Sequence, residues 1–186
     1  MKRAALAILP ALFVLGCAES DQNPFIVRVT TINNGAALLA DVIAINTTDQ
    51  TAFIPTDVTP VVMSNRPYSE SVVVDGTTFA LDFQVHGYTV TFRPTQGTPP
   101  GLALAPYTHT ETTSVLVPIN GSATLGVLIA PLSMKTDAPF AALQNGGQIP
   151  LIADIDIVGG SAVNPDEPIH VHASLSVVFA NFADAN

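Results

Sequence analysis

The sequence predicts an all-β fold, an antiparallel β-sandwich of about eight strands with one short helical turn. Gly, Pro, Asn and Asp recur at intervals of about ten to fifteen residues, a spacing typical of turns between short strands. The runs between these turns are rich in Val, Ile, Thr, Phe and Tyr, which favour strands. No window of helical length carries a sustained apolar stripe with a period of about 3.6 residues.

The expected strands follow one another from the start of the domain to its end. Apolar or alternating runs predict strands over 25–33, 35–45, 58–67, 85–94, 112–119, 122–130, 149–158 and 169–179. Asn33, Asn34 and Gly35 mark the turn between the first two runs, because these residues tolerate the positive φ angles of tight turns. A long loop is expected over 47–57.

Two of the middle runs carry more specific signals. Pro60 lies within the third run, and because proline has no main-chain N–H group, we expect an edge strand or an interrupted one there. In the fourth run, Tyr88, Val90 and Phe92 share one face and are expected to point into the core.

The fifth and sixth runs are separated by Asn120 and Gly121, which predicts a β-hairpin. The helical turn is expected after this hairpin, in the stretch DAPFAALQNGG. Asp137 is expected to cap it, Pro139 suits its first turn, and Gly146 is expected to end it.

The last two runs alternate between apolar and polar residues, which is typical of half-buried strands. In IPLIADIDIV (149–158), apolar side chains face one way, while Asp154 and Asp156 face the other. In IHVHASLSVVF (169–179), His170 and His172 lie on the polar face. The connection between the runs is rich in turn residues, so we expect an antiparallel hairpin.

Two packed sheets of short strands resemble the immunoglobulin-like sandwich. About 170 residues follow the predicted signal, a length suited to one domain, which we expect over 25–186. The Cys–Trp–Cys pattern of antibody domains is absent, because the chain has one Cys and no Trp. A closed barrel is the alternative arrangement of the same strands.

The N-terminal segment has the pattern of an export signal. Lys2 and Arg3 precede thirteen uncharged residues, AALAILPALFVLG, fewer than the ~20 that span a bilayer as a helix. The run ends in Val14-Leu15-Gly16-Cys17, which resembles the lipobox of bacterial lipoproteins. The stretches PFIVRVTTINNG and SVVFANFADAN also resemble parts of uncharacterised bacterial lipoproteins, a resemblance that implies no activity.

The lipoprotein resemblance implies a signal peptide over 1–16, an acylated Cys17, and a short tether over 17–24. Two or more acyl chains form a stable membrane anchor, because each buried methylene contributes about 0.8 kcal/mol. Ala18 follows the cysteine, and in this family pattern that implies the outer membrane, on its periplasmic or outer surface. An ordinary secretory signal with an incidental cysteine is the alternative.

The charge balance is strongly acidic. The formal net charge is −9, and all fifteen acidic residues but only four of the six basic residues follow Cys17. Such a surface repels phosphate backbones, so we do not expect a nucleic-acid partner. The acids are scattered, which is typical of a soluble surface facing the periplasm or the medium.

A candidate metal site lies on the predicted C-terminal hairpin. His170 and His172 project from the same face of one strand, roughly 6–7 Å apart at the backbone. Two imidazoles at this spacing suit a zinc or copper ion, and Asp154 or Asp156 on the neighbouring strand is the expected third ligand. The alternative is that these side chains form the solvent-exposed face of an amphipathic strand.

No catalytic or cofactor motif is present: the sequence lacks G-x-S-x-G, S-x-x-K and H-E-x-x-H. We therefore expect no enzyme activity and no cofactor. The sequence predicts a lipid-anchored envelope protein with a structural or protein-binding role, and a metal-binding protein using His170 and His172 is the alternative.

Overall fold

The computed structural model describes residues 25–46, 48–68, 81–161 and 167–182. The predictions for the signal peptide, for Cys17 and for the tether lie outside these residues. Within them, the chain forms ten strands where the sequence predicted about eight. The strands are β1 (Phe25–Ile32), β2 (Leu38–Asp41), β3 (Ala44–Ile45), β4 (Ala52–Phe53), β5 (Asp57–Pro67), β6 (Phe83–Pro94), β7 (His109–Val117), β8 (Gly121–Ala130), β9 (Gln148–Ser161) and β10 (Ile169–Ala180).

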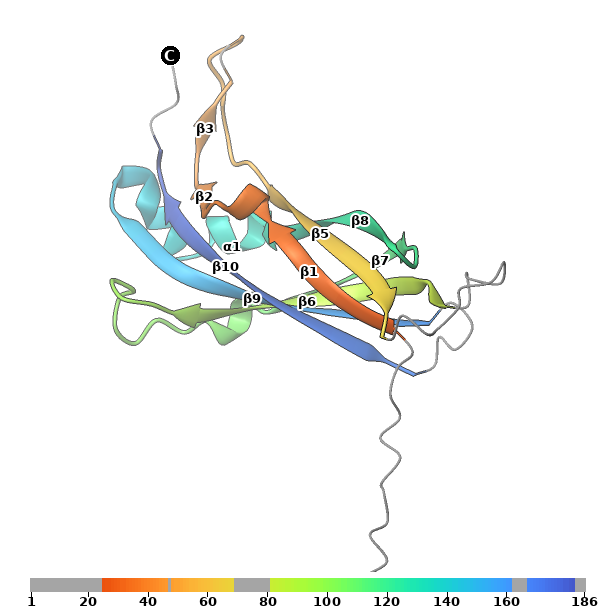
Figure 1. The fold of residues 1–186 in the computed structure, drawn as a ribbon. Coiled ribbons are helices and arrows are strands. Elements are labelled where there is room, and N and C mark those ends of the chain that lie inside the picture. Colours follow the sequence, from red (N-terminus) through yellow and green to blue (C-terminus); the bar gives the residue numbers. More distant parts are fainter. Residues whose placement is uncertain (1–24, 47, 69–80, 162–166, 183–186) are drawn as a thin grey trace, which may run out of the picture.

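The strands form two main sheets and one short hairpin. A three-stranded sheet has the order β1-β5-β8, and a five-stranded sheet has the order β2-β10-β9-β6-β7. Figure 1 shows the three-stranded sheet lying across the five-stranded one. Strands β3 and β4 pair only with each other. All pairs are antiparallel except β2 with β10, so the prediction of purely antiparallel sheets is wrong at this one pair.

The two sheets bury one continuous apolar core. Val61 and Leu125 contribute to it from the three-stranded sheet, and Val90, Ile155 and Phe179 contribute from the five-stranded sheet. Each of these side chains is at most 1% exposed, because side chains alternate between the two faces of a strand and these residues lie on the inner face. The fold is therefore all-β and sandwich-like, as the sequence predicted.

The predicted strand over 35–45 is broken. A 3-10 turn, η1 (Asn33–Gly35), has positive φ angles at all three residues, which confirms the predicted turn. The chain then forms two short strands in place of one, β2 in the five-stranded sheet and β3 in the small hairpin. The predicted loop over 47–57 contains β4 and the first residue of β5.

Pro60 lies in β5, the central strand of its sheet, so the prediction of an edge strand is wrong. The pairing explains why proline is tolerated there. β1 pairs with β5 only as far as Val61, opposite Ile32, whereas Pro60 is paired only with Gly126 of β8. At Pro60, β5 thus has a partner strand only on the side of β8. On the side of β1 there is no partner, so the missing N–H group of the proline costs no hydrogen bond there.

The predicted hairpin across Asn120 and Gly121 is also wrong. β7 pairs with β6 in one sheet, whereas β8 pairs with β5 in the other. The turn itself is tight, with φ +55° at Asn120 and a hydrogen bond from the Gly121 N–H to the Pro118 carbonyl. The Ile119 N–H is held by Asp82 Oδ1 at 2.8 Å, so the chain is redirected from one sheet to the other.

Besides η1, the helical segments among the described residues lie between β8 and β9 and before β7. They are α1 (Leu132–Thr136), η4 (Phe140–Asn145) and η3 (Ala105–Tyr107). The predicted turn is η4, and it ends at Gly146 (φ +108°) as expected. Asp137 does not cap it with its side chain; Pro139 occupies the N-cap position. No helix among the described residues is long and apolar enough to cross a bilayer.

The C-terminal hairpin forms as predicted. β9 and β10 pair without a register shift from Ile169 opposite Gly159 to Ala180 opposite Gln148. β6 pairs with β9 on its other side, and Tyr88, Val90 and Phe92 point into the core as expected.

Candidate functional site

The candidate site lies on the outer face of the five-stranded sheet. In the register of β9 and β10, His172 lies opposite Asp156, and Ser174 lies opposite Asp154. Because side chains alternate along each strand, the buried residues between them fix these four polar side chains on the outer face. The hairpin thus places the sequence-predicted residues in two neighbouring rows.

The first group of side chains is Asp156 with two histidines. His170 Nδ1 lies 3.0 Å from Asp156 Oδ2, and His172 Nδ1 lies 3.3 Å from Asp156 Oδ1. The two imidazole rings are stacked, with centroids 6.2 Å apart and an interplanar angle of 21°. The Asp156 carboxylate therefore contacts both imidazole rings. The structure thus brings together three of the residues predicted for the site, Asp156, His170 and His172.

Asp154, the fourth predicted residue, belongs to a different group. Its Oδ2 lies 2.7 Å from Arg93 Nε, and Ser174 Oγ donates a hydrogen bond of 2.5 Å to its Oδ1. Its carboxylate is therefore occupied on both oxygens by partners other than the histidines. Among the described residues, no group of three or more His, Cys, Asp and Glu side chains is arranged to hold a metal ion.

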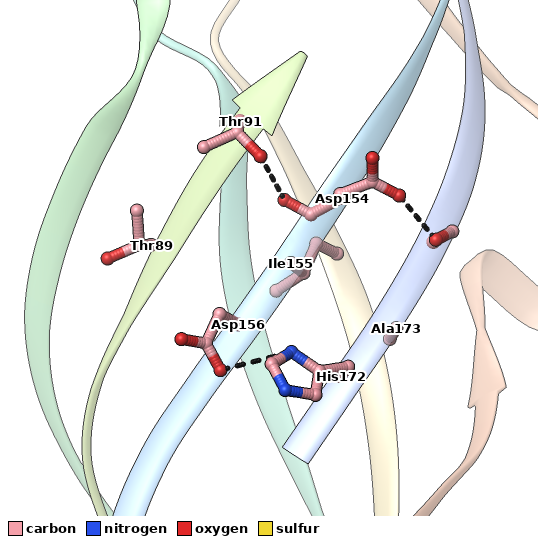
Figure 2. A pocket seen from close by; sticks show the side chains of 8 residues that line it. Thr89, Thr91, Asp154, Ile155, Asp156, His172 and Ala173 are labelled. Carbon is pink, nitrogen blue, oxygen red and sulfur yellow. Dashed lines mark hydrogen bonds and ion pairs between the residues drawn. The ribbon is translucent and has the colours of Figure 1, made fainter. Parts of the chain in front are cut away.

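A hollow of about 420 Å³ lies between these two groups (Figure 2). It is lined by Thr89, Thr91, Asp154, Ile155, Asp156, His172, Ala173 and Ser174. Figure 2 shows Asp156 pointing to His172 on one side and Asp154 held on the other, with Thr91 Oγ1 at 3.5 Å from the Asp154 carbonyl oxygen. The hollow is an open depression across β6, β9 and β10, and both polar and apolar groups line it.

The polar face continues across β6 to the sheet edge. Thr89 Oγ1 and Thr110 Oγ1 are 2.8 Å apart, and Gln84 Nε2 donates a 3.0 Å hydrogen bond to Ser114 Oγ. These residues were not predicted from the sequence as part of the site. The inward pattern of Tyr88, Val90 and Phe92 was the available signal, because it places Thr89, Thr91 and Arg93 on the opposite face.

The site is well exposed to solvent. The His172 side chain is 74% exposed and that of Asp156 is 34% exposed. Ion pairs in such surroundings contribute about 0–1 kcal/mol to folding, because water screens the charges and long side chains lose entropy. The cluster therefore adds little to stability, and its regular hydrogen bonding orients polar groups toward solvent.

A second charged group was not predicted from the sequence. Lys135, in α1, is fully buried, and its Nζ lies 2.8 Å from Asp57 Oδ2. The Nζ also donates to the carbonyl oxygens of Asp41 and Pro55, at 2.6 and 2.5 Å. Burial raises the pKa of Asp57, and the interaction with Lys135 opposes that rise. This pair joins α1 to the start of β5 and the end of β2.

Comparisons with models of protein families, with curated proteins and with solved structures give no match. The arrangement of residues on this face is therefore the basis on which a function is proposed.

Proposed function

We propose that the chain is a lipid-anchored, non-catalytic protein of the bacterial cell envelope that binds another protein through the outer face of its five-stranded sheet. The anchor would be Cys17, placing the domain at the outer membrane on its periplasmic or outer surface. The observation that carries the binding role is the row of exposed polar side chains across β6, β9 and β10, oriented by their mutual hydrogen bonds. Orientation before binding lowers the entropy lost on association.

We further propose that the sandwich is immunoglobulin-like. In that fold, the first, second, fourth and fifth strands share one sheet, and the third, sixth and seventh share the other. If the short strands β2, β3 and β4 are set aside, the order β1-β5-β8 and β10-β9-β6-β7 matches this scheme except at the fourth strand, which has no counterpart among the described strands of the three-stranded sheet. β7 corresponds to the additional strand that variable-type domains have in the other sheet. The strand order therefore supports the proposal.

Cross-linking from defined positions tests the binding face. A photo-reactive amino acid at Thr91, which is exposed in the site, should cross-link a protein in intact cells. The same group at Val58, which is 59% exposed on the other sheet, serves as the control. The same product from both positions, or none from Thr91, would contradict this binding face.

A charge change at the site sharpens the same test. Asp156→Asn removes the carboxylate that holds both histidines, so the cross-link from Thr91 should fall several-fold. Glu111→Gln removes an exposed acid from β7 and should leave the cross-link unchanged.

The anchor has a separate test. Cys17→Ser removes the only thiol of the chain, so the protein should leave the membrane fraction and appear in the soluble one. If Cys17→Ser stays with the membrane after a high-salt wash, the anchor is wrong. The binding face is not affected by that outcome.

Metal binding is the second candidate function. The position of the Asp156 carboxylate between His170 and His172 favours it, since carboxylate and imidazole groups are the ligands that zinc uses in proteins. The side chains would have to reorient, because the stacked rings make no three-residue group suited to a metal. Stoichiometric zinc or copper in untagged protein, lost in a His170→Ala/His172→Ala variant, would support this function. A metal-free protein whose Tm is unchanged by added zinc would exclude it.

A further inference from the structure

The edge of β10 on the side away from β9 is unpaired over most of its length. β9 pairs with all of β10, but on the opposite side β2 pairs only with Val177–Ala180. No strand among the described residues pairs with Ile169–Ser176 on that side. The first part of β10 is therefore an open edge of the five-stranded sheet.

The main-chain groups on this edge can be assigned by strand alternation. Val42 N–H donates to the Ala180 carbonyl at 3.0 Å, so Ala180 directs its main-chain groups toward β2. Alternate residues of a strand direct N–H and C=O groups to the same side. His170, His172, Ser174 and Ser176 therefore direct theirs toward the open side, away from β9.

The unpaired edge of β10 borders two hollows on the side of β1. Two adjoining hollows, of about 300 and 570 Å³, separate the edge from β1 and η1. Both are lined by Thr30, Thr31 and Ile32 of β1 and by Ser174 of β10. Ala36, Ala37 and Ala173 are among the other lining residues, and such small side chains allow a backbone to approach closely.

Two edge strands of the molecule, β1 and β7, carry features that discourage strand addition, and β10 does not. β1 has a bulge between Val29 and Thr31, and the pairing of β7 with β6 is interrupted between Val85 and Gly87. Bulges of this kind blunt exposed edges. β10 has no register shift, and Ile169–Ser176 contains no proline, lysine or arginine. Its edge is regular and available for pairing.

We propose that the open edge of β10 binds an extended, basic segment of a partner protein as an added β-strand. This inference rests on the proposed protein-binding function and names the partner's form and the place where it docks. Strand addition supplies affinity through main-chain hydrogen bonds. The charge of the segment follows from the net charge of −9 and from Asp154 and Asp156 on the adjacent strand. The same net charge disfavours a second copy of this chain as the occupant.

Hydrogen exchange with a designed peptide tests the proposal. The full chain, solubilised in detergent, is mixed with a peptide of alternating Lys and Val residues as long as Ile169–Ser176. The amides of His170, His172 and Ser174 should exchange about tenfold more slowly or better with the peptide bound. Unchanged exchange at these amides would overturn the proposal.

Matched peptides separate main-chain pairing from charge. N-methylation of alternate peptide residues removes the donors facing β10, and each lost hydrogen bond should lower affinity about two- to tenfold. A peptide of alternating Glu and Val should bind more weakly than the Lys–Val peptide. Equal binding of the N-methylated peptide would exclude strand addition, and equal binding of the Glu–Val peptide would exclude a basic partner.

Protein variants give an independent readout. Ser174→Pro removes one outward N–H group and should abolish the slowed exchange. Ser174→Ala loses the same hydroxyl but keeps that N–H group, so the exchange should still be slowed by the peptide. If these amides exchange slowly without peptide, and more slowly at higher protein concentration, the occupant of the edge is a second copy of the chain, and the proposal is overturned. If Thr91 gives no cross-link but the peptide still binds at β10, the proposed binding through the outer face is wrong, and strand addition at β10 stands.

Discussion

Two acid–base groups lie at different depths in this domain, and their surroundings give them different roles. Lys135 is fully buried, and its partner Asp57 has a side chain that is 11% exposed. Asp156 and its two histidines lie on an open face, where the His172 side chain is 74% exposed. Contact distances are similar in both groups, at 2.8 Å and 3.0–3.3 Å. Burial, and not contact distance, therefore decides which group stabilises the fold.

The difference follows from the cost of removing charge from water. A buried charge that loses its partner keeps its desolvation cost, whereas an exposed charge is re-solvated. The buried pair connects α1, β2 and β5, so its loss would affect the packing of several elements. The exposed cluster connects two strands that are already paired along their length. The first group is thus suited to stability, and the second is the group to which the proposed binding role is assigned.

The largest effect is expected from breaking the buried pair. Lys135→Met removes the ammonium group from Asp57 and from two carbonyl oxygens, and should lower the free energy of unfolding by about 3–5 kcal/mol. Urea denaturation followed by circular dichroism measures the change. Replacing both partners, in Lys135→Met/Asp57→Leu, should recover part of the loss. A single variant within about 1 kcal/mol of wild type would contradict this role.

A buried but uncharged polar group should have an intermediate effect. Asn65 is 1% exposed, and its Nδ2 donates to the carbonyls of Leu81 and Val117 at 2.8 and 3.2 Å. Asn65→Leu has a similar volume but leaves both carbonyls without this donor, so a loss of about 1–3 kcal/mol is expected in the same denaturation experiment. A loss as large as that of Lys135→Met would show that charge is not the deciding property.

The pH dependence of stability provides a smaller test of the buried pair. Burial holds the pKa of Asp57 above its usual value of 3.8 in the folded state. Between the two pKa values, the Asp57 carboxyl group is therefore protonated in the native state but ionised in the unfolded state. The contribution of Asp57 to the free energy of unfolding is thus fully present below pH 3.8 and is lost as the pH rises through the folded-state pKa. Relative to Asp57→Asn, wild-type stability should fall over that interval. A relative rise would show that Lys135 outweighs burial.

The smallest effect on stability is expected at the exposed cluster. Asp156→Asn should change the free energy of unfolding by less than about 1 kcal/mol, because both histidines remain accessible to water. The same variant should reduce the cross-link from Thr91, so stability and binding are expected to respond separately. A large loss of stability with binding unchanged would reverse the roles assigned to the two groups.

The sequence predicted the exposed cluster better than the buried pair, for a physical reason. The alternation of residues 149–158 and 169–179 fixes which side chains share a face, and a hairpin places opposite residues together. Asp154 or Asp156 was therefore predicted beside His170 and His172, and the register of the hairpin selects Asp156. Asp154 was predicted equally near, but it pairs with Arg93 of β6, a strand whose position beside β9 has no local signal.

Long-range partners account for the other differences. Lys135 and Asp57 are far apart in sequence, and no local pattern indicates that a lysine in a short helix is buried. The Asn120–Gly121 turn was predicted correctly as a turn, but turn chemistry does not determine whether the next strand stays in the same sheet. Likewise, Pro60 signals a missing hydrogen bond without showing that β1 ends before reaching it.

The passage of the chain from one sheet to the other near its start has a mechanical consequence. β1 is paired with β5 in the first sheet, and after η1 the chain continues as β2, paired with β10 in the second. Tension applied at Phe25 would first act on the β1–β5 ladder and reach β2 only after that ladder had parted. If the domain is anchored at its N-terminal end, a pulling force is therefore expected to unfold it in two stages. The β1–β5 pairing separates first, and the five-stranded sheet bears the force only afterwards.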